Sequence, residues 1–151
     1  MKVGIYGQYY KEDSEEYILK LLEVLQRNKA EVYLESEYLM QIKEPLGITE
    51  VYKTFSSFND LDNSFDIFLS VGGDGTMLRT VLFVRDLDIP ILGINTGRLG
   101  FLATVQKENI EAAIEEVLKN RFEVKKRALL QVSAETPMED QTEVNFALNE
   151  I

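Results

Sequence analysis

The chain has 151 residues, of which 45% are hydrophobic and 28% charged, and it carries a formal net charge of −10 at pH 7. This length matches one ordinary domain with a real core, and the even mixture of apolar and charged residues excludes the disordered, collagen-like and low-complexity classes. The sequence contains no cysteine and no histidine, which excludes disulfide frameworks, thiol nucleophiles, zinc-thiolate sites and Ser-His-Asp triads.

The acidic balance also limits the partners, because nucleic acid and anionic membranes repel a negative protein, and we expect neither. No run approaches 18 apolar residues, and the first residues lack a secretory pattern, so the expected compartment is the cytoplasm. Residues 72–104 differ from the rest, with three positive and three negative groups and six of the nine glycines. This neutral, glycine-rich centre is suited to an anionic small molecule.

The first elements follow a strand-helix-strand order. A buried strand is predicted over residues 2–7, and Asp13 can cap a helix that ends near Asn28. A second strand is predicted over residues 30–34. Residues 36–63 are interrupted by proline, glycine and a polar loop, and we expect only short helical pieces there.

The central elements repeat this order. The apolar run 65–71 is typical of a parallel strand covered on both faces, and residues 77–85 have helical character, with Leu78, Val81, Leu82 and Arg85 on successive turns. A strand is then predicted over 89–94, a glycine loop over 95–100 and a short extended piece over 101–105.

Asn109 is expected to cap a final helix that buries Ile110, Ala113, Ile114, Val117 and Leu118. The order of elements predicts an α/β fold with a doubly wound, mostly parallel sheet and helices on both faces. We therefore assign residues 1–122 to one α/β domain, whose ligand class depends on the motifs described below. Alternating apolar residues over 128–134 and 144–148 predict a β-hairpin turned at 136–140. A lone hairpin is marginal in water, so it either packs on the α/β part or begins a second, β-rich domain. We assign residues 123–151 to the start of an incomplete all-β domain.

Gly72-Gly73-Asp74-Gly75-Thr76 follows a predicted strand directly, where open α/β sheets bind ligands and helix N-termini suit anions. Two glycines would let the chain turn tightly with positive φ and approach a phosphate, with Asp74 at the mouth of a cleft. The alternative is a simple turn in which Asp74 or Thr76 caps the next helix. From spacing alone, both interpretations stay open.

Known nucleotide motifs narrow the chemistry of this loop. The pattern GxxxxGK[ST] is absent, and GxGxxG fails because Leu78 stands where glycine is needed. A P-loop enzyme and an ordinary dinucleotide dehydrogenase are therefore excluded. A carboxylate between glycines favours phosphoryl transfer, in which Asp74 takes a proton from an attacking hydroxyl or organises Mg²⁺ around phosphates.

The loop is followed by Asn95-Thr96-Gly97-Arg98-Leu99-Gly100-Phe101-Leu102 and, near the end, by Asn149-Glu150 in a strand. In this order and spacing the three motifs resemble the NAD kinase family over the whole chain. The first loop alone is also similar to loops of lipid kinases and phosphofructokinases. The block at 95–102 discriminates, because lipid kinases do not continue in that way.

The resemblance implies that Asp74 accepts the proton of the adenosine ribose 2′-hydroxyl of NAD⁺ as that hydroxyl attacks the terminal phosphate of ATP, giving NADP⁺. It implies that Gly75 and Arg79 contact the dinucleotide and that Asn149 and Glu150 hydrogen-bond its adenosine or ribose groups. Mg²⁺ would accompany ATP, with no protein ligand assigned to it. Family members are commonly homo-oligomers, so a dimer or tetramer is expected, with an all-β second domain.

Asn149 and Glu150 conflict with strict alternation, which puts Glu150 on the face of Val144, Phe146 and Leu148 and Asn149 on the other. A bulge or strand end near Leu148 would turn both toward one ligand. Without the resemblance, Glu150 is interpreted as a solvated residue. Family members continue beyond this length through a β-rich domain, so we assign the activity to that larger architecture and not to these 151 residues alone.

Two alternatives remain at this point. A kinase acting on a lipid or a sugar phosphate would explain the loop at 72–76 alone. A noncatalytic nucleotide-binding fragment would explain a chain shorter than its family.

Overall fold

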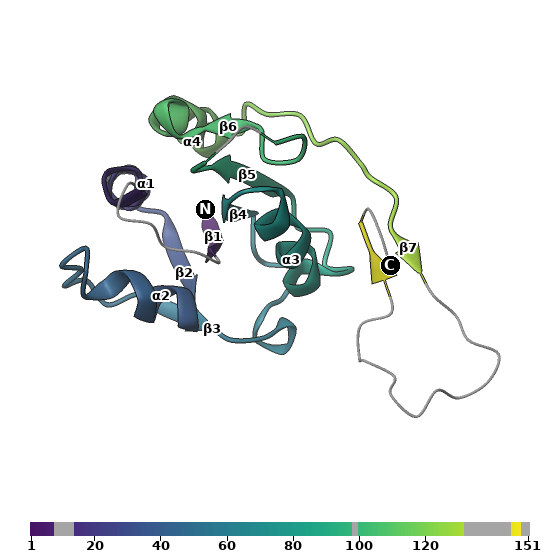
Figure 1. Cartoon of the computed structure of the whole chain (residues 1–151), viewed down its shortest axis with the longest axis horizontal. Helices are drawn as coiled ribbons and strands as arrows, with labels where there is room; N and C mark the ends of the chain where they lie inside the picture. The colour runs from purple at the N-terminus through teal and green to yellow at the C-terminus, as the bar shows by residue number, and fades with distance from the viewer. Residues whose placement is uncertain (8–13, 98–99, 132–145, 149–151) are drawn as a thin grey trace.

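The computed structural model describes residues 1–7, 14–97, 100–131 and 146–148. Six strands form one sheet in the order β3-β2-β1-β4-β5-β6, and every neighbouring pair is parallel (Figure 1). The predicted α/β class is confirmed, and the sheet is wholly parallel, not mostly so. The strands are β1 (Lys2–Gly7), β2 (Glu31–Glu35), β3 (Lys53–Phe55), β4 (Ile67–Gly72), β5 (Ile91–Asn95) and β6 (Val105–Gln106).

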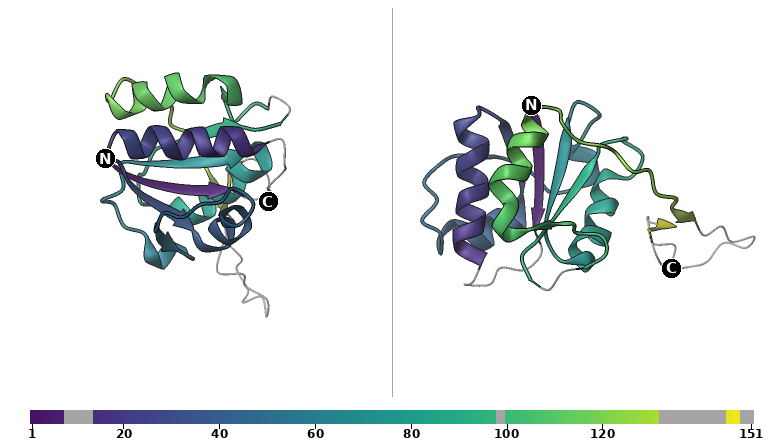
Figure 2. Two further views of the ribbon diagram at one scale, coloured as in Figure 1. Left: turned by 90° about the vertical axis from the view of Figure 1, so that its left-hand side faces the viewer. Right: turned by 90° about the horizontal axis from the view of Figure 1, so that it is seen from above.

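Helices cover both faces of the sheet, as predicted for a doubly wound fold. The α-helices are α1 (Glu15–Arg27), α2 (Ser36–Lys43), α3 (Asp74–Val84) and α4 (Ile110–Leu118), and the short 3₁₀ turns are η2 (Phe58–Asp60) and η3 (Lys107–Asn109). Helices α1 and α4 lie side by side on one face, and α3 lies on the other (Figures 1 and 2). This arrangement follows from right-handed crossovers, since the chain leaves β1 in one direction and β4 in the opposite direction.

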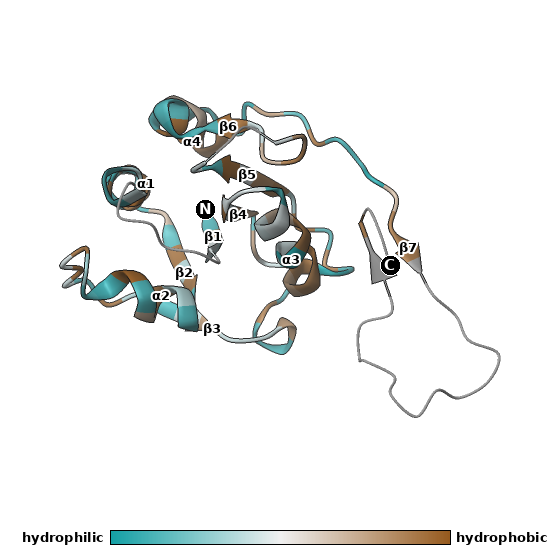
Figure 3. Cartoon of the chain, viewed as in Figure 1, coloured by the Kyte–Doolittle hydropathy of each residue, from teal (hydrophilic) through white to brown (hydrophobic). Residues whose placement is uncertain are grey.

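Each face of the sheet has its own hydrophobic core. Alternate residues of β1 point to opposite faces, so Val3 and Ile5 meet α1, α2 and α4 while Tyr6 joins a cluster on the α3 side. That second cluster is rich in aromatic side chains, and Phe68 is fully buried in it. Strand β5 is hydrophobic along most of its length (Figure 3).

The strand order places a topological switch between β1 and β4. From β1 the chain builds β2 and β3 on one side, and from β4 it builds β5 and β6 on the other. Gly7 at the end of β1 pairs with Val71 near the end of β4, so these carboxyl ends lie together. In open α/β sheets the crevice outside such a switch is the usual ligand site.

Several element boundaries differ from the prediction. Helix α1 has Ser14 as its N-cap and begins at Glu15, while Asp13 lies outside the described residues. Helix α4 begins after Asn109 as predicted, although the Asn109 side chain makes no cap hydrogen bond. Residues 36–63 hold more structure than expected, because α2 is a full helix and β3 adds a strand. Within the segment 101–105, the structure assigns strand geometry only to Val105, in β6.

Helix α3 begins at Asp74, three residues before the predicted segment 77–85. The predicted helical character is confirmed, and the buried residues of α3 are Thr76, Thr80, Val81 and Val84, whereas Leu82 is exposed. Helix α2 begins where the buried Glu35 side chain accepts hydrogen bonds from the N–H groups of Glu37 and Tyr38, at 3.0 and 2.8 Å. Glu35 is therefore both the last residue of β2 and the N-cap of α2.

After α4 the chain is exposed over residues 119–130 and leads away from the sheet to β7 (Leu130–Gln131) (Figure 1). Strand β7 pairs antiparallel with β8 (Phe146–Ala147), as the predicted hairpin requires. The predicted turn at 136–140 lies outside the described residues. In the described part of the chain, this pair is the extent of the expected β-rich domain.

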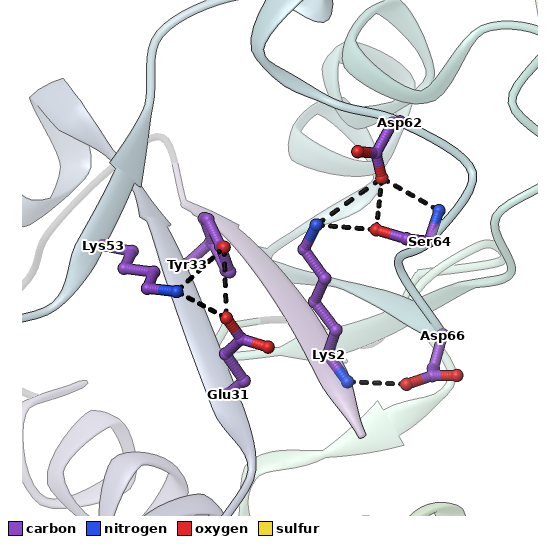
Figure 4. A network of polar contacts seen from close by, with 7 residues as sticks. All are labelled: Lys2, Glu31, Tyr33, Lys53, Asp62, Ser64 and Asp66. Atoms are coloured by element: carbon purple, nitrogen blue, oxygen red, sulfur yellow. Dashed lines mark hydrogen bonds and ion pairs between the residues drawn. The ribbon is translucent and has the colours of Figure 1, made fainter.

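Polar contacts around the start of β1 stabilise the side of the sheet at which the strands begin (Figure 4). The backbone N–H of Lys2 donates to Asp66 at 2.6 Å, and the Lys2 ammonium donates to the Ser64 hydroxyl at 2.7 Å. The same ammonium lies 4.0 Å from the centroid of the Phe65 ring. Among the described residues, no helix is long and apolar enough to cross a membrane.

Candidate active site

The glycine loop turns the chain sharply from β4 into α3. Gly72 has a φ of +155°, and a Cβ at this position would overlap the Thr76 side chain, so only glycine fits. Gly73 is the N-cap, with a φ of −109°, and the prediction of positive φ is therefore right for Gly72 and wrong for Gly73. An added Cβ at Gly73 or Gly75 would meet nothing within 4 Å, which leaves open space at the start of α3.

Asp74 contacts a distant part of the chain. Its carboxylate accepts hydrogen bonds from the backbone N–H groups of Phe101, Leu102 and Ala103, at 2.8, 3.0 and 3.1 Å. The alternative in which Asp74 or Thr76 caps the helix is wrong, because the N-cap is Gly73 and has no side-chain cap hydrogen bond. The three N–H donors, that of Phe101 most strongly, hold the pKa of the Asp74 carboxyl below its ordinary value. Asp74 is therefore ionised at neutral pH.

The segment 100–103 lies close to both α3 and β5. A Cβ on Gly93 in β5 would come within 2.6 Å of the Ala103 Cα atom, so the segment rests directly on the strand. A Cβ on Gly100 would overlap the Asp74 carboxylate. Two glycines thus permit the close packing that brings three N–H groups to one carboxylate.

A buried polar contact ties α3 to the strand below it. The Thr80 hydroxyl lies 2.8 Å from the Ser70 hydroxyl in β4 and 2.8 Å from the Thr76 carbonyl oxygen. Both Ser70 and Thr80 are almost fully buried. Buried hydroxyls need such partners, so this contact fixes the first turns of α3 against β4.

The carboxyl end of β5 lies beside that of β4, on the same side of the sheet as the glycine loop. The N–H of Thr96 donates to the Gly72 carbonyl oxygen at 3.2 Å, and the N–H of Gly97 donates to the side-chain oxygen of the buried Asn95 at 2.9 Å. Beside them is a hollow of about 200 Å³, lined by Asn95, Gly97, Gln106, Lys107 and Glu108. A larger hollow of about 470 Å³ lies at the end of α2. Neither hollow is lined by Asp74, Gly75 or Arg79, so neither is the cleft that the sequence predicts beside Asp74.

Arg79 is exposed on α3. Burial raises the pKa of Tyr6 in β1, and the charge of the nearby Arg79 opposes that rise. Arg79 thus lies near Tyr6, toward the carboxyl end of β1. Tyr6 was missed in the sequence, although its place at the end of a strand is a signal that could have indicated it.

The structure places three predicted site residues together, because Asp74, Gly75 and Arg79 all lie on the first half of α3. Asn149 and Glu150 lie outside the described residues. The N–H groups of residues 101–103 were also missed. Backbone donors are the same for every residue type, so no sequence signal identifies them.

The donor set does not fit a divalent cation held by the protein alone. In the part of the chain that the structure describes, no three acidic side chains gather at one point. Asp74 already accepts three hydrogen bonds, whereas Mg²⁺ in proteins prefers free carboxylates and phosphate oxygens. A magnesium ion at this edge would need oxygens from a bound phosphate compound.

Comparison with known proteins gives a family match over most of the chain. The profile described as the ATP-NAD kinase N-terminal domain matches residues 3–122. The chain is 48% identical over 151 residues to an NAD kinase of Christiangramia forsetii, covering 100% of this chain and 51% of that protein. It thus spans about half the length of the curated relatives it matches.

The solved structures similar to this chain include one from yeast and one from Archaeoglobus fulgidus. Yeast NADH kinase complexed with NADH matches with a TM-score of 0.77 and 20% identity, over 98% of this chain and 46% of that one, which supports the fold alone. An NAD kinase from Archaeoglobus fulgidus in complex with ATP matches with a TM-score of 0.50 and 26% identity, over 80% of this chain and 38% of that one.

Proposed function

The chain belongs to the ATP-NAD kinase family, and from that premise we propose that it supplies the catalytic aspartate of an NAD kinase. The reaction transfers the γ-phosphoryl group of ATP to the adenosine ribose 2′-hydroxyl of NAD⁺. The hydroxyl oxygen bonds to the γ-phosphorus, the bond from that phosphorus to the β–γ bridging oxygen breaks, and ADP leaves. The hydroxyl proton passes to Asp74, and the product is NADP⁺.

The observation that carries this proposal is the ionised Asp74 carboxylate at the switch between β1 and β4. A carboxylate offers about four acceptor sites. Oδ1 accepts from Leu102 and Ala103 and Oδ2 accepts from Phe101, which leaves an acceptor site on Oδ2. A substrate hydroxyl can donate to that site.

A low pKa makes Asp74 a weak base for an alcohol, so its main contribution is to orient the hydroxyl. An oriented hydroxyl in line with the γ-phosphorus needs little help from proton transfer early in the reaction, because phosphoryl transfer has a loose transition state. The proton then moves to Oδ2 as the new bond forms.

The start of α3 suits the charged parts of the substrates. The first N–H groups of a helix favour anions, and the open space at Gly73 and Gly75 lets a phosphate approach the backbone. Arg79, which lies beside Tyr6, adds a positive charge. We assign Gly75 and Arg79 to contacts with the dinucleotide.

The remaining parts of the proposal lie beyond the described α/β unit. Mg²⁺ arrives with ATP and balances the charge of its phosphates. Asn149 and Glu150 bind the adenosine or ribose groups, and residues 123–151 begin a β-rich second domain, which the antiparallel pair β7–β8 supports. The assembly is a cytoplasmic homo-oligomer, either dimer or tetramer.

The test is formation of NADP⁺ from NAD⁺, ATP and Mg²⁺. It is run with this chain and with a chain extended to the length of its relatives. In the active form, Asp74→Asn should lower kcat by about 10²–10⁴-fold, the usual contribution of a catalytic acid or base. Asp86→Asn is the matched control, because Asp86 is exposed beyond the other end of α3.

Three outcomes would contradict the proposal. Full activity of Asp74→Asn would remove Asp74 from the reaction. Phosphorylation of diacylglycerol or fructose 6-phosphate, with none of NAD⁺, would overturn the substrate. Calorimetric binding of NAD⁺ by the extended chain without turnover would indicate a noncatalytic nucleotide-binding module.

A further inference from the structure

Gly100 directly precedes the three N–H groups that hold Asp74. A Cβ built on Gly100 overlaps Asp74, and its three nearest atoms are Oδ1, Cγ and Oδ2 of that one side chain. Glycine is therefore required at this position for space, and the carboxylate fills that space.

The segment on the other side of the contact has little room to retreat. Ala103 rests on β5, where even a methyl group on Gly93 would come within 2.6 Å of the Ala103 Cα atom. A side chain at position 100 would therefore displace the carboxylate more readily than the backbone. The three hydrogen bonds from Phe101, Leu102 and Ala103 would be weakened together.

We infer that Gly100 is a positioning residue for Asp74. Its missing side chain seats the carboxylate on three consecutive N–H groups, and this seat fixes the orientation of the carboxylate. The contact joins two segments 27 to 29 residues apart, so it also sets the distance between α3 and the chain after β5. The benefit to catalysis rests on the proposed NAD kinase function, whereas the seating itself does not.

A double-mutant cycle in the whole chain tests the seating of Asp74 through thermal stability, without an enzyme assay. Gly100→Ala alone should lower the Tm by about 5 °C. In an Asp74→Ala background the same change should lower it much less, because no carboxylate is left to overlap. If the single variant fails to fold, folding of the double variant supports the inference. Equal losses in the two backgrounds, or an unfolded double variant, would overturn it.

A second readout follows the carboxyl group itself. In Gly100→Ala, the Asp74 pKa measured by NMR should rise toward the ordinary value of about 3.9, because its N–H donors are lost. Gly97→Ala is the matched loop control, since its Cβ would lie 4.0 Å from the Asn95 side-chain oxygen, which is an ordinary contact. An Asp74 pKa that Gly100→Ala leaves unchanged would overturn the inference.

The catalytic part is tested in the extended, active enzyme. Gly100→Ala should lower kcat by about 10²-fold, as expected for a displaced reacting group, with the KM for ATP unchanged. Asp86→Asn, which lies beyond the other end of α3, should keep its kcat. The double-mutant cycle could show that Gly100 and Asp74 are coupled in stability while Gly100→Ala keeps its full kcat. That result would overturn the claim that the seated carboxylate serves the reaction. If the unsubstituted enzyme forms no NADP⁺, the proposed function fails, and the cycle still decides the seating.

Discussion

The guanidinium group of Arg27, at the end of α1, donates a hydrogen bond to the carboxylate of Glu111 in α4 at 3.0 Å. The same group donates to Glu115 at 2.8 Å, and the Lys20 ammonium lies 3.1 Å from Glu111. These exposed ion pairs join two helices that lie side by side on one face of the sheet (Figure 2). They hold α4 in place beside α1, above the shared core.

Glu111→Gln should lower the Tm at low salt, because it removes the carboxylate shared by Arg27 and Lys20. The loss should nearly vanish in 1 M NaCl, where the Debye length is about 3 Å and exposed charges are screened. Differential scanning calorimetry at the two salt concentrations measures both effects. Glu23→Gln, which removes only a pair within α1, is the control, and a loss that persists in 1 M NaCl would contradict the electrostatic explanation.

Phe68→Ala should lower the free energy of unfolding by about 3–5 kcal/mol, the usual cost of deleting a buried aromatic ring. Phe68 is fully buried in β4, where its ring meets Phe55 edge-on with centroids 5.3 Å apart. Urea unfolding measures the loss. Phe101→Ala is the control, because its side chain is 93% exposed and should change stability by less than about 0.5 kcal/mol.

Stability should fall as the pH drops below about 4, the ordinary carboxyl pKa. The hydroxyl and N–H of Ser64, followed by the charge of Lys2, lower the pKa of Asp62 (Figure 4). A carboxyl whose pKa is lowered by folding stabilises the fold above its unfolded pKa, and this contribution is lost as the pH falls through the folded pKa. Urea unfolding from pH 2.5 to 7 should show a weaker acid dependence in Asp62→Asn. An unchanged acid dependence would remove Asp62 from this explanation.

Tyr6→Phe should raise the KM for NAD⁺ by about 10-fold in the active enzyme, because it removes the hydroxyl that lies beside Arg79 and helps to orient the guanidinium. The buried ring stays in place, so the stability should change little. Steady-state kinetics measures the KM. Tyr33→Phe is the control, since the Tyr33 hydroxyl contacts Glu31 on β2. An unchanged KM in Tyr6→Phe would separate Arg79 from dinucleotide binding.

The buried strands could be predicted because burial leaves a direct trace in the sequence. Ile67–Gly72 and Ile91–Asn95 are covered on both faces, which requires continuous apolar runs. Strand β3 has only three residues, and two of them, Lys53 and Thr54, are exposed. It is a strand because it pairs with β2, and this pairing has no local sequence pattern.

The candidate site also has parts that could be predicted from the sequence and parts that could not. The glycine loop and Asp74 could be predicted, because a turn at positive φ and a carboxylate depend on residue type. The partners of Asp74 could not, since Phe101, Leu102 and Ala103 contribute backbone N–H groups and their side chains carry no matching chemistry. The position of Tyr6 beside Arg79 could not be predicted, because an aromatic residue in a buried strand is usually a core residue.

The sheet ends on each side in a very short strand, β3 with three residues and β6 with two. An exposed edge strand can pair with a strand of another chain, and such pairing can start a fibril. Here each edge strand exposes only two or three peptide groups, and β3 also carries the charge of Lys53. A protein rich in parallel β-structure is thereby guarded against self-association through its sheet, even at high concentration in the cell.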